Sequence, residues 1–262
     1  MNDLKKELET ASKAAKQAGK LIVSKIDKRP ERWQKAPGDF VSSVDLSAEE
    51  IVGKMIKNNF PDDGIMSEED LNFGLEKKRF WILDPLDGTM NYLRRIPFFS
   101  VSLALFKNHE VILGVVYDPY HDNLFTAVKN NGAFLNGKKI SVGETSNLVE
   151  CCIATEYIGY LDSVKKRRLL GRLGEFFGNI RMIGSQALDL AYTAAGQIDI
   201  AFLPRSNPWD MAGGSILVKE AGGTVWAPGG YSCLKSGQII AGNEKLVKEF
   251  VNEILEKKYQ IF

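Results

Sequence analysis

The chain has 262 residues, of which 44% are hydrophobic and 26% charged, which is the composition of an ordinary folded protein. Its 34 basic and 33 acidic residues leave a formal net charge of +1, so no overall field directs the chain towards nucleic acid or a membrane. A chain of this length can bury a substantial core and lies near the size at which one core divides in two. We expect one domain over residues 1–262, either undivided or with two lobes at about 1–145 and 146–262.

No apolar stretch reaches the roughly 18 to 20 residues needed to cross a bilayer. The amino end alternates charged and small apolar side chains and lacks the continuous hydrophobic stretch of a signal peptide. The three cysteines, Cys151, Cys152 and Cys233, have neither the even number of a disulfide framework nor a C-x-x-C spacing. We therefore expect a cytoplasmic protein with inert thiols and no membrane partner.

The first part of the chain has the pattern of two helices. Apolar side chains recur every three or four positions over residues 4–22, which predicts an amphipathic helix. Residues 29–40 contain two prolines and a glycine and are expected to form a loop. Ser47 and Glu50 have the spacing of a capping box, so a second helix is expected from there to about residue 59.

Strand patterns follow. Short apolar runs predict strands at 80–83, 99–106, 111–117 and 124–128. Residues 108–110 join two of these strands as a hairpin, and Asn136-Gly137 is typical of another hairpin turn.

The second half is less regular. Residues 151–183 have weak patterns, whereas helices are expected over 186–195, ending at Gly196, and over 211–221. Blocks of helix and blocks of strand in one chain predict an α+β fold in layers, with antiparallel or mixed sheets.

The most informative segment is the turn Asp84-Pro85-Leu86-Asp87-Gly88-Thr89. Two carboxylates three residues apart can aim at one point when proline stiffens the turn and glycine reverses it. Hard divalent cations need such converging oxygens, and Mg²⁺ accepts a few carboxylates while keeping waters and phosphate oxygens as its other ligands. Free backbone N–H groups at Gly88 and Thr89 can hold a phosphate. Taken alone, the two aspartates fit a polar turn with a capping side chain at least as well.

Two further acidic segments change that balance. Glu68-Glu69 follows an apolar approach, and Asp210 begins an apolar helix that contains glycine. Counting the turn, three segments resemble the motifs of the inositol monophosphatase family in the right order. They are residues 64–69, residues 81–91 as W-x-x-D-P-(I/L)-D-G-T-x-N, and residues 209–213 as the first five positions of W-D-x-A-(A/G)-G, continuing to 223. The resemblance spans essentially the whole chain and implies a five-layer α-β-α-β-α sandwich of the sugar phosphatase type, usually a homodimer.

The same resemblance implies roles for individual residues. It implies a cluster of two or three Mg²⁺ ions, for which Mn²⁺ can substitute. The implied ligands of these ions are Glu68, Asp84, Asp87, Asp210 and the carbonyl of Leu86. It makes Asp45 and Thr89 the pair that orients an attacking water, with Glu68 also in the catalytic set, and it makes Gly88 and Thr89 the phosphate cradle. Lys35 lies near the loop lysine of the family, although its spacing to Asp39 is one residue shorter than in the animal enzymes.

The expected reaction is hydrolysis of a small sugar or polyol phosphate by activated water. Two metal ions about 3.5 to 4 Å apart can neutralise both ends of an in-line displacement, and a bound metal lowers the pKa of water from 15.7 towards about 7. No histidine is needed, which suits a chain with two, His109 and His121, in expected turns or loops. Inhibition by lithium is expected from the resemblance.

The substrate contacts depart from the animal pattern. In the animal enzymes, a glutamate seven positions before the metal-binding aspartate contacts the inositol hydroxyls. Leu203 stands at that position in this chain. Arg205 resembles what several bacterial relatives carry, and it suits sugar hydroxyls or a second phosphate as well as a plain surface position. Asp210, Ser185 and Ala187 complete the expected substrate contacts.

Myo-inositol 1-phosphate is the first substrate expected, and fructose 1,6-bisphosphate or a nucleotide 3′-phosphate such as adenosine 3′,5′-bisphosphate or NADP is the alternative. A regulatory binding protein on the same fold should have lost a metal ligand, and none is lost. A haloacid dehalogenase would need a nucleophilic aspartate where Pro85 stands. Residues 132–138 have the spacing of a P-loop, but Lys139 replaces its hydroxyl residue.

Overall fold

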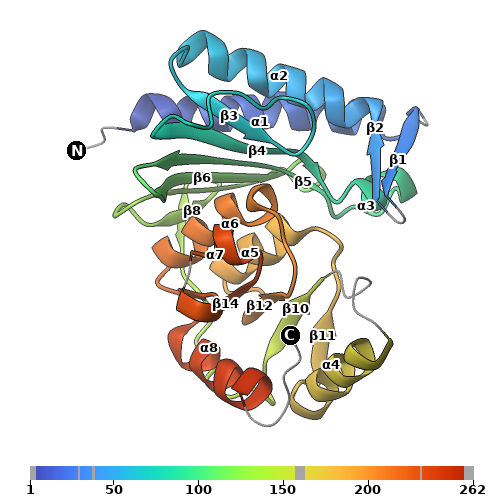
Figure 1. Cartoon of the computed structure of the whole chain (residues 1–262), viewed down its shortest axis with the longest axis vertical. Coiled ribbons are helices and arrows are strands. Elements are labelled where there is room, and N and C mark those ends of the chain that lie inside the picture. Colours follow the sequence, from blue (N-terminus) through green and yellow to red (C-terminus); the bar gives the residue numbers. More distant parts are fainter. Residues whose placement is uncertain (1–3, 29, 37–38, 157–162, 231, 257–262) are drawn as a thin grey trace.

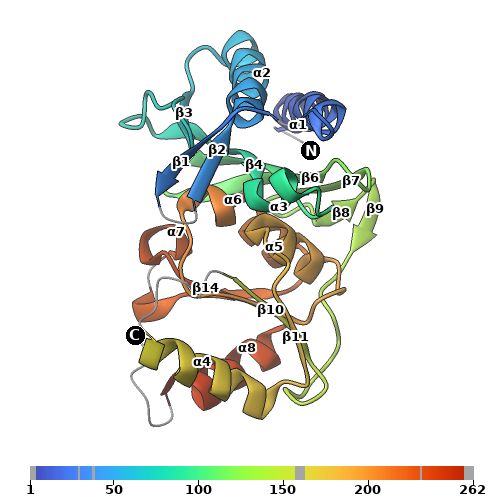
Figure 2. The ribbon, with the colours of Figure 1, turned by 90° about the vertical axis from the view of Figure 1, so that its right-hand side faces the viewer.

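The computed structural model describes residues 4–28, 30–36, 39–156, 163–230 and 232–256. Helices and sheets alternate in five layers from one end of the molecule to the other (Figure 1). Two long helices cover a seven-stranded sheet, two further helices lie beneath it, and a five-stranded sheet and an outer pair of helices follow (Figure 2). The expected α-β-α-β-α sandwich is thereby confirmed.

The first layer consists of α1 (Lys5–Lys25) and α2 (Ser43–Asn59). The apolar stripe of α1 is made largely of alanine, and Gly19 lets the helix approach the sheet so closely that a Cβ there would lie 2.6 Å from the Tyr117 ring. The first predicted helix is confirmed. The second begins four residues earlier than predicted, because Ser42 and Asp45 form the capping box, whereas Ser47 Oγ donates inside the helix to the Ser43 carbonyl.

The expected loop at 29–40 is wrong in its central part. Residues Arg32–Ala36 (β1) and Asp39–Ser42 (β2) form an antiparallel two-stranded sheet beside the main body. All of β1 is exposed, so it has no apolar alternation from which a strand could be predicted. Two of the three expected breakers, at 37 and 38, lie outside the described residues.

The seven-stranded sheet has the order β3-β4-β5-β6-β7-β8-β9, and only β3 and β4 run parallel in it. Its strands are β3 (Gly64–Ser67), β4 (Arg79–Asp87), β5 (Ser100–Lys107), β6 (Glu110–Asp118), β7 (Asn123–Val128), β8 (Ala133–Leu135) and β9 (Lys138–Ile140). The four predicted strands are confirmed: β4, β6 and β7 extend further than predicted, and β5 is shifted by one residue. Asn136 and Gly137 both have positive φ, as the predicted hairpin turn requires.

The central layer holds α5 (Gln186–Ala194) and α6 (Pro208–Glu220), both predicted from the sequence. Gly196 has φ +69° and ends the turn after α5, as expected. Because α6 packs between the two sheets, it is buried on nearly every side. A Cβ on Gly114 of β6 would lie 2.5 Å from the Gly213 carbonyl, so two glycines let helix and sheet touch.

The five-stranded sheet has the order β11-β10-β12-β14-β13 and mixes parallel and antiparallel pairs. Its strands are β10 (Cys152–Thr155), β11 (Asn179–Arg181), β12 (Ile200–Leu203), β13 (Thr224–Trp226) and β14 (Ile239–Gly242). The outer layer is α4 (Ser163–Phe176), α8 (Glu244–Phe250) and a π-helical turn at Val251–Glu256. Within the described ranges there are also the short helices α3 (Thr89–Arg94) and α7 (Cys233–Ser236) and a 3-10 turn at Pro228–Gly230.

The structure also bears on the cysteines and on membrane spans. Cys151 is buried and Cys152 half-buried, both as free thiols, and burial raises the pKa of Cys151 to about 12, so it is unreactive. In the described part of the chain, no helix combines the length and the apolarity that a bilayer span demands. The division into lobes at 1–145 and 146–262 stays a prediction, since α5 and α6 contact both sheets.

Candidate metal centre

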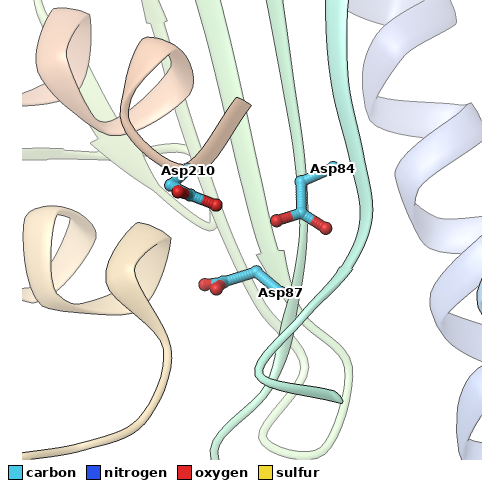
Figure 3. A group of neighbouring side chains, drawn as sticks. All are labelled: Asp84, Asp87 and Asp210. Carbon is cyan, nitrogen blue, oxygen red and sulfur yellow. The ribbon is translucent and has the colours of Figure 1, made fainter. Parts of the chain in front are cut away.

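Three aspartates converge where β4 ends and α6 begins. Asp84 and Asp87 lie at the end of β4, and Asp210 lies in the first turn of α6. Each contributes one carboxylate oxygen to a group in which all atoms lie within 4.8 Å of one another, and all three residues are buried. Figure 3 shows the three side chains directed into one common space. The central part of the predicted ligand set is therefore brought together by the fold.

The turn at the end of β4 positions two of these side chains. The pairing with β5 becomes irregular between Asp84 and Asp87, and Asp84 accepts a hydrogen bond from the Leu86 N–H at 3.0 Å. Gly88 then adopts φ +86°, where a Cβ would lie 2.9 Å from the Phe98 carbonyl. The local chain thus leaves the sheet as a tight turn, and only glycine fits its reversal point.

The electrostatics of the three aspartates favour a bound cation. Burial raises the pKa of Asp84 well above its ordinary value, and the charges of Glu68, Asp87 and Asp210 raise it further. Burial and Asp87 do the same to the pKa of Asp210. Buried like charges are costly unless protons or cations compensate them. Hard carboxylate oxygens at this spacing fit Mg²⁺ or Mn²⁺, so the residues present suit the implied metal.

Glu68 approaches this group from β3 but is held by a lysine. Its carboxylate lies 3.2 Å from Lys35 Nζ, and Glu69 lies 2.6 Å from the same nitrogen. Burial disfavours the ammonium, but Glu68 and Glu69 outweigh this effect and raise the pKa of Lys35. Burial also raises the pKa of Glu69 to about 7. Glu68 also forms a side-chain hydrogen bond with Asp84 and raises its pKa, although it does not belong to the compact group of three.

Asp45 and Thr89 form the hydrogen-bonded pair that the sequence predicted. The Thr89 hydroxyl lies 2.9 Å from Asp45 Oδ1 and 3.0 Å from the Leu86 carbonyl, so it can donate to either. Asp45 Oδ2 accepts the Ser42 N–H at 2.9 Å, which fixes the carboxylate at the start of α2. Burial raises the pKa of Asp45, and the bonds from Ser42 and Thr89 work against that rise. Ser42 was missed, although its spacing to Asp45 is that of a capping box.

Asp87 is anchored by the turn that begins α5. Its carboxylate accepts the Ser185 hydroxyl and the N–H groups of Gln186 and Ala187, at 3.3 and 2.9 Å for the two backbone donors. Ser185 and Ala187 were expected to contact the substrate, and here they bind Asp87. Their role towards a substrate stays a prediction.

The expected specificity residues Leu203 and Arg205 lie at the end of β12 and on the segment that joins it to α6. Leu203 is fully buried in β12, so it presents no polar group at the position of the animal glutamate. Arg205 is exposed two residues later. Ser206, which follows it, is tied to Gln186 and to the Gly237 carbonyl, a pair of contacts that no sequence pattern indicated.

The layered fold and the buried carboxylate centre define a class of phosphatases that use divalent cations. The sequence model of the inositol monophosphatase family matches residues 3–260, and the chain belongs to that family. The family and the fold together support a metal-dependent phosphatase.

Individual relatives agree with this assignment. Nus factor SuhB of Escherichia coli strain K12 is 38% identical over 250 residues, which cover 92% of each chain. Inositol monophosphatase 3 of Solanum lycopersicum is 37% identical and covers 95% of this chain and 96% of its own. Among solved structures, suhB of Bartonella henselae has a TM-score of 0.91 at 34% identity, covering 95% of this chain and 98% of its own. An IMPase of Thermotoga maritima has a TM-score of 0.87 at 35% identity, with 96% and 98% covered.

Proposed function

We propose that the protein is a Mg²⁺-dependent phosphatase that hydrolyses a small phosphate monoester, with myo-inositol 1-phosphate as the first candidate. The convergence of Asp84, Asp87 and Asp210, beside the Thr89–Asp45 pair, is the observation that carries the proposal. Glu68 and the Leu86 carbonyl complete the ligand set that we assign. When bound, divalent cations supply charge neutralisation at the phosphoryl oxygens and a lowered pKa for the attacking water.

The protein's own groups have separate tasks. A Thr89 hydroxyl that donates to Asp45 leaves its oxygen lone pairs free to accept a hydrogen bond from water, which orients that water for attack. The N–H groups at Gly88 and Thr89 lie at the start of α3, where the helix itself offers them no acceptor, and can hold phosphate oxygens. No side-chain nucleophile is required.

Fructose 1,6-bisphosphate is a second candidate, because Leu203 lacks an oxygen for polyol hydroxyls whereas the guanidinium of Arg205 can pair with a second phosphate. A nucleotide 3′-phosphate stays an alternative on the same grounds. Homodimer formation, a cytoplasmic location, lithium inhibition and the absence of nucleic-acid and membrane partners remain predictions.

Phosphate release from three substrates tests the proposal: inositol 1-phosphate, fructose 1,6-bisphosphate and adenosine 3′,5′-bisphosphate. Each is assayed with Mg²⁺ and with a chelator. We expect at least one to be hydrolysed with Mg²⁺ only, and the ratio of kcat/KM values to identify the substrate class. Folded protein that binds Mg²⁺ but hydrolyses none of them would favour the regulatory binding protein.

A further inference from the structure

Two buried carboxyl groups outside the metal centre have no place in the reaction described above. Glu156 follows β10 and is 8% exposed, and Asp189 lies in α5 and is fully buried. Among the described residues, neither oxygen of Asp189 has a hydrogen-bond donor. A charged carboxylate in such a place would bear a large desolvation cost without compensation. Its state therefore requires an explanation.

Glu156 supplies that explanation, because its side chain lies within hydrogen-bonding reach of the Asp189 carboxyl group. Two carboxylates are acceptors only, so a hydrogen bond between them requires a proton. Burial raises the pKa of Asp189 well above its ordinary value and Glu156 raises it further, while burial raises the pKa of Glu156 to about 7. The other titratable groups that act on the pair are Asp87 at the end of β4 and Tyr192 one turn along α5. None of these is a cation that could replace the proton.

A metal ion explains the pair less well. In the portion of the chain that the structure describes, the group of three acidic side chains close enough to hold an ion is Asp84, Asp87 and Asp210, and it includes neither Glu156 nor Asp189. A proton needs no cavity and no third ligand.

The pair is connected to the metal centre through one turn. Glu156 accepts the N–H of Gly184 at 2.5 Å. Gly184 has φ +83°, and a Cβ there would lie 2.7 Å from the Asn91 amide, so the turn is tightly enclosed. The next residues, Ser185 to Ala187, hold Asp87. A displacement of Glu156 would therefore move the turn at Gly184, and with it the groups of Ser185 to Ala187 that hold the Asp87 carboxylate.

We propose that Asp189 and Glu156 share one proton, with the Asp189 hydroxyl donating to Glu156, and that both act as positioning residues for the turn that holds Asp87. The kinetic part of this inference rests on the proposed phosphatase function. The shared proton does not, because it is a property of the folded chain alone.

Infrared spectra test the proton directly. The difference between wild type and Asp189→Asn, recorded with saturating Mg²⁺, should contain the carbonyl stretch of a protonated carboxylic acid at neutral pH. Asp118→Asn is the matched control, since Asp118 is equally buried but accepts hydrogen bonds from Tyr120, His121 and Tyr192. The Asp118→Asn protein should keep this band, so the band should cancel in the difference between wild type and Asp118→Asn. Absence of the band from the Asp189 difference spectrum overturns the proposal.

Kinetics then test the positioning role. Asparagine at 189 retains a donor to Glu156, so kcat and Mg²⁺ affinity should stay within about threefold of wild type, whereas Asp189→Ala should lose about 10- to 100-fold, the range seen for groups that orient metal ligands. Equal loss in both variants overturns this role. If Asp189→Ala does not fold, Glu156→Gln tests the role instead: glutamine can still accept from Gly184 and donate to Asp189, so activity should stay within about threefold, and a loss of about tenfold or more overturns the role. Failure of the proposed function would appear as an inactive wild type with the infrared band intact.

Discussion

Two groups of buried acids contact the turn that begins α5, and they resolve the same electrostatic problem in different ways. Asp84, Asp87 and Asp210 come from two elements and converge with several oxygens directed into one space (Figure 3). Glu156 and Asp189 lie within hydrogen-bonding reach of each other, and the backbone at Ile183 and Gly184 donates to Glu156. The first arrangement has converging ligand atoms for a cation, whereas the second has two carboxyl groups that one proton can join. A metal centre is therefore distinguished from a structural pair of acids by how many carboxylate oxygens converge on one point, more than by how many acidic residues are buried.

Substitution of Asp87, which belongs to the first group and is held by the turn that the second group contacts, should have the largest effect on turnover. Asp87→Asn removes a metal ligand with little change of volume, so turnover should fall more than about 100-fold, beyond the loss typical of outer groups. The fold should be retained, as circular dichroism can check. Wild type should gain about 2.7 kcal/mol of stability at Mg²⁺ concentrations 100 times Kd, and the variant should lose that gain.

Asp27→Asn is the control, because Asp27 has a side chain that is 82% exposed. It should behave as wild type in turnover and in the Mg²⁺-induced rise of Tm. An Asp87→Asn protein with near-normal Mg²⁺-dependent activity would contradict the metal assignment.

The pH dependence of Mg²⁺ binding tests whether the metal centre exchanges protons for a cation while the Glu156–Asp189 pair keeps its proton. Raised pKa values of Asp84 and Asp210 mean that the metal-free fold holds protons that Mg²⁺ must displace. Mg²⁺ affinity should therefore rise with pH, by about tenfold per pH unit for each proton displaced. The stability that these groups give the metal-free protein is present at low pH and is lost as pH rises through their raised pKa values.

Calorimetry in two buffers with different ionisation enthalpies measures the released protons. Asp189→Asn should leave this release unchanged if its proton belongs to the separate pair. An affinity that does not vary with pH would show that the carboxylates are already ionised.

Gly88 and Gly137 separate the cost of a close approach from the cost of a left-handed backbone. Both have positive φ, but a Cβ on Gly88 would lie 2.9 Å from the Phe98 carbonyl and 3.0 Å from that of Gly184, whereas a Cβ on Gly137 would meet nothing within 4 Å. Gly137→Ala should cost about 1 to 2 kcal/mol of unfolding free energy. Gly88→Ala should cost at least about 1 kcal/mol more by urea unfolding. Equal costs would mean that the turn can open.

Sequence reasoning succeeded where local patterns determine the structure. Strands β4 to β7 of the seven-stranded sheet and helices α1, α5 and α6 have regular apolar patterns, and the acidic motifs identified three converging aspartates. It failed at β1, whose exposed residues give no pattern, and it misplaced the start of α2 because Ser47 imitates the cap that Ser42 provides. Burial of Glu156 and Asp189 depends on packing between distant elements, which no spacing along the chain could reveal.

Lys35 offers the smallest expected effect and the finest test of how the metal centre balances its charge. Its ammonium already compensates Glu68 and Glu69 at 3.2 and 2.6 Å, so it competes with any cation that Glu68 would bind. Lys35→Gln removes this competitor, and Mg²⁺ affinity should rise by about two- to fivefold, since a pair whose lysine side chain is 27% exposed is partly screened by solvent. Lys54→Gln, at an exposed pair with Glu50, is the matched control and should change nothing. Weaker Mg²⁺ binding in Lys35→Gln would mean that the lysine orients Glu68 as a ligand and that the cation and the ammonium cooperate at this centre.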